Sequence, residues 1–256
     1  MRDSGLEEAI RAVGGVSELA RRIGIAQPSV SNWDRVPAER VAAVEDATGI
    51  ERAVLRPDLF SRQAAAPIDA TDNARAAEYA LLATLLAQSP DANFLRRLSG
   101  LSGDATPLGA AHAELAAAAT RTNARDVERE FFRLFIGVGR SELLPYGSYY
   151  LTGFLHERPL ARLRADLKRI GIEKTEAQSE PEDHAAILCE IMAGLAARTY
   201  GAPGTDRQVF EKHVAPWMPR FFADLERSKS ADFYARVGAL GRVFMTIETE
   251  AFALPS

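Results

Sequence analysis

The chain has 256 residues, of which 47% are hydrophobic, so it can bury a core and a wholly disordered protein is excluded. Its 31 basic and 35 acidic side chains leave a net charge of -4, so any contact with nucleic acid or an anionic membrane must be local. The single cysteine excludes an intramolecular disulfide framework, and the lack of a signal-peptide pattern or a long apolar run predicts a cytoplasmic protein without membrane insertion.

Helix-forming residues dominate the chain and only 8% of residues are aromatic, which predicts an all-α fold. The stretch "SRQAAAPIDATDN" loses apolar periodicity and predicts a linker over residues 61–73, between a small domain at 1–60 and a larger one at 74–256. Apolar spacing and breakers predict helices, in chain order, at Gly5–Val13, Val16–Ile23, Gln27–Asp34, Ala38–Thr48 and Ala74–Gln88, then at 91–99, 107–122, 124–136, 159–170, 181–200, 206–228 and 231–252.

The first of these domains contains "VSELARRIGIAQPSVSNWDRVPAERV", which has the pattern of a helix-turn-helix. Ala20 is small where the two helices cross, Gly24 lies in the turn, and Val30 and Trp33 of the second helix are expected to face inward. Gln and Asn can read adenine edges, and Arg can reach guanine or phosphate. The exposed face of the second helix is expected to present Gln27, Ser29, Ser31, Asn32 and Arg35 to DNA.

A helical protein-interaction module of the same shape remains the alternative, because the unit is close to neutral. The stretches "RIGIAQPSVSNWDRVPAERV" and "LRPDLF" resemble the Cro/YdaS-type prophage and bacterial regulators. This resemblance covers residues 5–60 and implies that the unit binds double-stranded DNA. Such domains usually act as dimers on two-fold sites, so a homodimer is expected.

The larger domain contains "SEPEDH", directly before an apolar run, which predicts a helix start. Either Ser179 and Glu182 form a capping box, or Glu180 caps the helix with Pro181 at its first position. Both arrangements hold carboxylates against the positive end of the helix dipole. Neither explains His184.

Two aromatic segments accompany this helix start. "LLPYGSYYLTG" predicts a loop with three tyrosines, of the kind that often forms a binding surface. In "FEKHVAPWMPRFFADL", Trp217 lies between two prolines that are expected to kink a helix and to open a groove. Packing in the core is the alternative for Trp217, Phe221 and Phe222.

Catalytic and metal chemistry is not supported by the pattern of polar residues. The four histidines are scattered, Cys189 has helical spacing within an apolar run, and no glycine-rich nucleotide loop of standard spacing is present. We therefore predict no metal ligand, no cofactor and no catalytic residue. An enzyme is the least favoured class.

The order of "LFIGVGRSELLPYGSYYL", "EPEDH" and "FEKHVAPWMPRFF" resembles the TorD/DmsD-type redox-enzyme maturation chaperones over residues 74–252. The resemblance implies an all-helical domain that binds the twin-arginine signal peptide, or the apo form, of a molybdenum or tungsten oxidoreductase until the cofactor is inserted. Gly147 departs from the family loop, where a larger or acidic residue is more usual. The implied peptide-binding residues are Tyr146, Ser148, Tyr150, Glu180, Pro181, Asp183 and His184.

The signal peptide of such a client has two arginines followed by an apolar stretch. Its receptor therefore needs carboxylates beside an apolar or aromatic groove. The leading hypothesis is a maturation chaperone whose client occupancy is coupled to DNA binding by its head. One alternative is a transcription regulator whose larger domain serves for dimerisation or ligand sensing; another is a chaperone whose head only contacts proteins. The acidic group of the expected groove is Glu180, Glu182 and Asp183, and its aromatic group is Tyr146, Tyr149, Tyr150 and Trp217.

Overall fold

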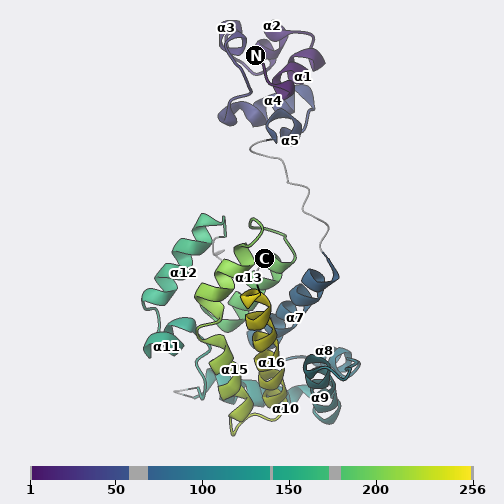
Figure 1. Ribbon diagram of the computed structural model, residues 1–256, viewed down its shortest axis with the longest axis vertical. Coiled ribbons are helices and arrows are strands. Elements are labelled where there is room, and N and C mark those ends of the chain that lie inside the picture. The colour runs from purple at the N-terminus through teal and green to yellow at the C-terminus, as the bar shows by residue number, and fades with distance from the viewer. Residues whose placement is uncertain (1, 58–68, 139–140, 173–179, 255–256) are drawn as a thin grey trace. The chain divides into compact units, whose positions relative to one another are not determined.

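The computed structural model describes residues 2–57, 69–138, 141–172 and 180–254 (Figure 1). The chain divides into two compact units, Met1–Pro67 and Ile68–Ser256, which are described separately below. All regular structure in the described ranges is helical, apart from one isolated bridge between Tyr146 and His184. Within those ranges, every helix is too short or too polar to cross a membrane.

The smaller unit is a cluster of short helices around one apolar core. Leu19 and Val30, from the two helices of the predicted helix-turn-helix, are fully buried in that core, whereas Trp33 is only half-buried. Gly24 adopts a positive φ of 70° in the turn, which glycine tolerates at little cost. The helices are α1 (Ser4–Ala12), α2 (Val16–Arg22), α3 (Gln27–Ser31), the 3-10 turn η1 (Ala38–Arg40), α4 (Val41–Thr48) and α5 (Arg52–Leu55).

The larger unit is an all-helical bundle. Two of its helices continue into π-helical turns, η2 and η3, a local irregularity that is frequent at functional sites. Its elements are α7 (Ala70–Ala87), α8 (Ala92–Leu98), α9 (Pro107–Arg121), α10 (Ala124–Phe131), η2 (Phe132–Ile136), α11 (Gly147–Thr152), α12 (Arg158–Arg169), α13 (Ala185–Ala196), α14 (Thr205–Val209), η3 (Phe210–Val214), α15 (Met218–Arg227) and α16 (Phe233–Ala253).

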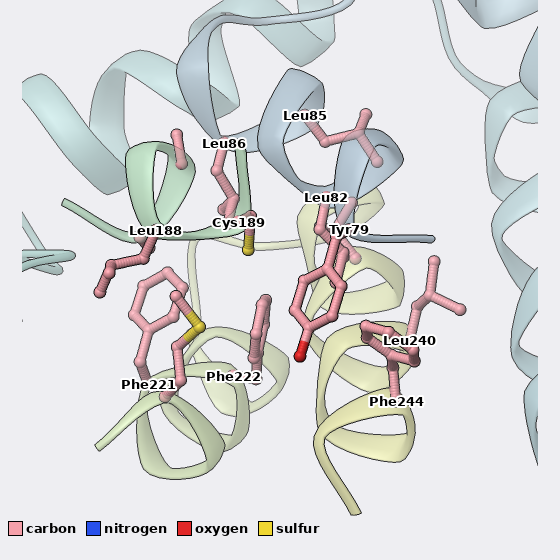
Figure 2. Close-up of a cluster of buried hydrophobic side chains, with 14 of the residues drawn as sticks. Tyr79, Leu82, Leu85, Leu86, Leu188, Cys189, Phe221, Phe222, Leu240 and Phe244 are labelled. Atoms are coloured by element: carbon pink, nitrogen blue, oxygen red, sulfur yellow. The ribbon is translucent and has the colours of Figure 1, made fainter. Parts of the chain in front are cut away.

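The core of the larger unit lies where α13 packs on α7 and α15 packs on α16 (Figure 2). Cys189 is buried there among Leu188, Phe221 and Phe222, and burial raises the pKa of its thiol well above the usual range. The core-packing alternative is therefore confirmed for both phenylalanines. Trp217 is also only 2% exposed.

Glu130 joins α10 to the start of α16. Its carboxylate accepts hydrogen bonds from the backbone N–H groups of Asp232, Phe233 and Tyr234 at 2.6–3.2 Å. These groups would otherwise have no partner at a helix start. A long-range side chain therefore supplies the cap that α16 lacks locally.

Several predicted element boundaries are wrong. α7 begins at Ala70, inside the segment predicted as a linker, because Asp69 caps it by accepting from the Asp72 N–H. The predicted tyrosine loop contains the helix α11. The helix predicted over 206–228 is divided into α14, η3 and α15, with an interruption before Trp217 where the prolines predicted a kink.

Candidate functional site

The tyrosine segment and the "EPEDH" segment, which are distant in sequence, pair through their backbones. The Ala185 N–H donates to the Pro145 carbonyl at 2.8 Å, and the Gly147 N–H donates to the Asp183 carbonyl at 2.9 Å. Tyr146 and His184 form the bridge between them, with ring centroids 5.0 Å apart. Two segments whose contact the sequence does not reveal are thus joined in the fold.

Asp183 caps α11. It is 3% exposed, and its Oδ2 accepts from the Ser148 N–H at 2.7 Å. Its Oδ1 and the Ser148 hydroxyl are buried without a hydrogen-bond partner among the described residues. Burying a polar atom without a partner is costly, so Asp183 Oδ1 is an acceptor that no described residue satisfies.

Gly147 stands where the resembled family usually has a larger or acidic residue, and the structure requires a glycine here. A Cβ at this position would lie 3.0 Å from Nε1 and 3.2 Å from Cε2 of Trp217, closer than ordinary contact. The Trp217 indole is held there because its Nε1 donates to the His213 carbonyl at 2.7 Å. A larger residue at 147 would therefore displace the tryptophan that backs α11.

His184, which neither predicted cap explained, is the cap of α13. The helix starts at Ala185, and His184 Nδ1 accepts from the Ala186 N–H at 3.1 Å. Burial lowers the pKa of His184 despite the nearby Glu180 and Asp183, which favours the neutral ring that this hydrogen bond requires. The prediction that Pro181 opens the helix is wrong, and the alternative cap by Ser179 involves a residue outside the described ranges.

The acidic side chains of the motif are engaged within the domain. Glu180 accepts from the Tyr146 hydroxyl at 2.8 Å, and this contact and burial raise the pKa of Tyr146. Glu182 is 8% exposed and pairs with Arg164 at 2.8 Å. Glu182 is therefore not the unpaired carboxylate that the expected groove requires. In Asp183, only Oδ1 has no partner among the described residues.

The remaining predicted residues lie close to these. Tyr150 is half-buried, its hydroxyl donates to Asp224 at 3.2 Å, and its ring centroid is 5.6 Å from that of Trp217. Pro181 is half-buried, and its carbonyl accepts from the His184 N–H. Of the aromatic group, Tyr149 and Tyr150 therefore belong to α11 and Trp217 packs against that helix, so the group does not form an open loop.

A cleft of about 650 Å³, here called the α12 cleft, lies between α11, α12, η3 and the start of α13. Apolar groups from Leu151, Leu163, Leu188 and Trp217 line it, and so does Asp183. Its polar lining residues include Arg158, Arg162, Asp166, Lys212 and His213.

Asp166 is balanced by its surroundings in this cleft. It pairs with Arg169 and with Lys212, and it accepts from His213 Nε2 at 2.8 Å. Burial, with Lys212 nearby, lowers the pKa of His213 to about 4, so the ring is neutral at pH 7. In contrast, no ion pair joins Arg158 or Arg162 to another described residue. The mouth of the α12 cleft is consequently cationic.

A second cleft of about 470 Å³, here called the α15 cleft, shares Leu151 and Thr152 with the first. Its charged lining residues are Glu142, Asp224 and Arg220, and it also includes Tyr149 and Tyr150. A hydrogen bond from Ser228 lowers the pKa of Glu142, so its carboxylate is ionised at neutral pH. The two clefts therefore differ in the sign of their charge.

The contribution of α12 was not predicted from the sequence. Arg158, Arg162 and Asp166 recur at intervals of four, which places them on one helix face, and this signal was present in the sequence. The carboxylates of Glu142 and Asp224 gave no such signal, because they come from segments 82 residues apart. Among the described residues, no group of three His, Cys, Asp or Glu side chains is arranged to hold a metal.

The predicted DNA-contacting residues lie on and after α3. Gln27, Ser29, Asn32 and Arg35 are exposed, whereas Ser31 is half-buried and accepts from Gln27 Nε2 at 2.8 Å. The expectation that one helix carries all five is wrong, since α3 ends at Ser31. Asn32 follows as its C-cap, and Arg35 lies beyond it.

Two family models match the chain, one in each unit. Residues 102–223 match the family described as the nitrate reductase delta subunit. Residues 6–64 match the family described as the bacterial toxin YdaS.

Curated relatives of the larger unit include the chaperone protein TorD of Vibrio atlanticus, 25% identical over 52% of this chain and 68% of that protein. The predicted resemblance is confirmed. TorD of Vibrio cholerae is 30% identical over 46% of this chain and 57% of that protein. The Tat proofreading chaperone DmsD of Salmonella typhi is 33% identical over 43% and 54%. The chain thus spans 54–68% of the length of these TorD and DmsD relatives.

A crystal structure from Archaeoglobus fulgidus, described as a redox enzyme maturation protein, aligns with a TM-score of 0.47 at 18% identity. The alignment covers 68% of this chain and 93% of the Archaeoglobus fulgidus chain.

Proposed function

We propose that the larger unit is a maturation chaperone without enzymatic activity, which binds the twin-arginine signal peptide or the apo form of a molybdenum or tungsten oxidoreductase until its cofactor is inserted. The observation that carries the proposal is the α12 cleft, where an apolar lining meets the unpartnered oxygen of Asp183. Similarity to the TorD and DmsD chaperones supports this class of client.

The apolar part of a client would bind around Leu151. This side chain is 44% exposed, lines both clefts, and is followed by Phe154 and Leu155, which are 69% and 41% exposed. An apolar helix or extended segment covering these residues would remove their exposed apolar surface from water, the main source of affinity in groove recognition. Asp183 Oδ1 would accept one hydrogen bond from the bound segment.

Titration of the chain with a peptide of two arginines followed by an apolar stretch tests this function. Leu151→Ser should weaken binding by roughly three- to tenfold, because full burial of a leucine contributes about 1.5–3 kcal/mol, Leu151 is 44% exposed before binding, and about 1.4 kcal/mol corresponds to tenfold in affinity. Ile247→Ser is the matched control, since Ile247 is 39% exposed on α16 and lines neither cleft. Absence of binding at micromolar concentrations would instead favour the transcription regulator.

For the smaller unit we propose binding to double-stranded DNA through Gln27, Ser29, Ser31, Asn32 and Arg35. The exposure of four of these polar residues beside the buried Val30 supports this role. Asn32→Ala and Arg35→Ala should reduce retention on DNA at fixed salt, whereas Arg11→Ala, on the exposed side of α1, should not. Unaltered retention of the first two variants would favour a protein-contact module.

The presence of both units in one chain motivates a further proposal, that client occupancy changes operator affinity. The two binding events must then be reciprocal, so that DNA changes peptide affinity by the same factor as peptide changes DNA affinity. Measuring both at one salt concentration tests the coupling. An operator affinity that saturating peptide leaves unchanged would remove the coupling and leave each binding role intact.

A further inference from the structure

We infer that a client peptide crosses α11 in one fixed direction, with its arginine pair in the α15 cleft and its apolar stretch in the α12 cleft. The inference rests on the proposed function and specifies how the site reads its ligand. Glu142 and Asp224 become the residues that recognise the arginines, in place of the acidic residues of the "EPEDH" segment.

The continuity of the two clefts supports a single ligand spanning both. Leu151 and Thr152 belong to the lining of each, so α11 is the ridge between them. Leu151 is 44% exposed at this ridge. A chain that covers Leu151 therefore enters one cleft on each side.

The charges of the clefts set the direction. The α12 cleft contains Arg158, Arg162 and Lys212, and of its two carboxylates Asp166 is balanced by neighbouring cations while Asp183 is buried. A guanidinium entering this mouth would meet like charge. The apolar lining of the same cleft suits the apolar part of a peptide, and Asp183 Oδ1 can accept one hydrogen bond from it.

The α15 cleft has the opposite character. Among its described lining residues, Glu142 and Asp224 outnumber one cation, Arg220, whose Nε lies 3.9 Å from Asp224, too far for a strong fork-like contact. Arg220 itself lies over the Tyr150 ring, with its guanidinium carbon 5.8 Å from the ring centroid, and Tyr149 adds further aromatic surface to the cleft. Two arginines therefore find carboxylates and rings here that the α12 cleft does not offer together.

The direction predicts a preference at the other end of the ligand. Arg158 and Arg162 lie four residues apart on α12, exposed at the mouth of the apolar cleft. An acidic residue placed after the apolar stretch of the peptide would lie beside them. The clefts would thus select peptides with a basic, an apolar and an acidic part in that order.

A double-mutant cycle tests the arginine site. The probes are a peptide of two arginines followed by an apolar stretch, and the same peptide with both arginines replaced by glutamine. The proteins are wild type and Glu142→Gln/Asp224→Asn, whose amides keep acceptors for Ser228 and Tyr150. We expect glutamine to weaken binding to wild type by about tenfold or more but to the variant by less than about threefold, with the difference shrinking at high salt.

Two outcomes would overturn the inference while leaving the proposed function standing. In the first, replacing the two arginines by glutamine weakens binding by the same factor in wild type and in the Glu142→Gln/Asp224→Asn variant. In the second, that loss of affinity disappears in Asp183→Asn instead, which would place the arginines in the α12 cleft. If neither peptide binds wild type at micromolar concentration, the proposed function itself fails. A second cycle uses peptides ending in aspartate or lysine: wild type should favour aspartate by at least about threefold, and Arg158→Gln/Arg162→Gln should lose that preference. An equal preference in both proteins would reject the direction.

Discussion

Asp183→Ala should destabilise the larger unit, whereas Asp183→Asn should preserve stability and weaken peptide binding. The two oxygens of this side chain have different surroundings: Oδ2 accepts from the Ser148 N–H at 2.7 Å, and Oδ1 has no partner among the described residues. Alanine leaves the buried Ser148 N–H unsatisfied. Loss of a hydrogen bond to a charged group costs roughly 1.5–3 kcal/mol, and removal of a buried charge offsets part of that, so we expect a net loss of about 2 kcal/mol.

Asparagine can keep an oxygen toward the Ser148 N–H and place its NH₂ group where Oδ1 was. Its cost in stability should stay below about 1 kcal/mol, but it offers a donor where a ligand requires an acceptor. Urea unfolding is best followed in a Trp33→Phe background, because Trp217 is then the only tryptophan and reports the larger unit. The alanine variant should lower the midpoint by roughly 1 M. Equal stability of alanine variant and parent, or equal losses in both variants, would refute the division of roles between the two oxygens.

Two further predictions concern the buried ionisable groups. Glu130→Ala should lower the free energy of unfolding by about 3 kcal/mol, because it leaves two fully buried N–H groups at the start of α16 without an acceptor. Glu130→Gln should lower it by only about 1 kcal/mol. Equal losses of the two variants in urea unfolding would contradict this cap. Because burial lowers the pKa of His184, the unfolded chain binds more protons as pH falls below about 6.5, so stability should decrease from pH 7 toward the folded pKa. His184→Asn keeps a capping acceptor that does not titrate, so its stability relative to wild type should rise as pH falls; parallel curves would reject the role of His184.

Apolar spacing in the sequence was sufficient to locate most helices of both units. The residues predicted to lie inside the small unit, such as Leu19 and Val30, are fully buried. Helix ends were less predictable, because local cap patterns compete with contacts that the sequence does not reveal. Ser179, Glu180 and Pro181 form a good start signal, yet the chain pairs Asp183 and Ala185 with the distant tyrosine segment and delays α13 to Ala185.

The same limit applies to the candidate site. Pro145 and Gly147 are turn-forming residues, and they predicted a loop where the structure has α11. Gly147 is required by the approach of Trp217, and the N-terminus of α11 is capped by Asp183 from 35 residues away. Neither contact has a local signature. The motif residues could be listed from sequence, but their burial and the cationic face of α12 required the fold.

The burial of Asp183 and His184 has a consequence for the meaning of the "EPEDH" segment. Each side chain holds the start of a helix that borders the α12 cleft, α11 for Asp183 and α13 for His184. A loss of peptide binding after truncation can therefore arise from a missing ligand contact or from a cleft whose borders are no longer fixed. Affinity per folded molecule separates the two, because a shape-preserving variant such as Asp183→Asn retains the border and changes only the acceptor. The segment thus first positions the borders of the cleft, and Asp183 Oδ1, which has no partner among the described residues, is the atom that we propose contacts a client.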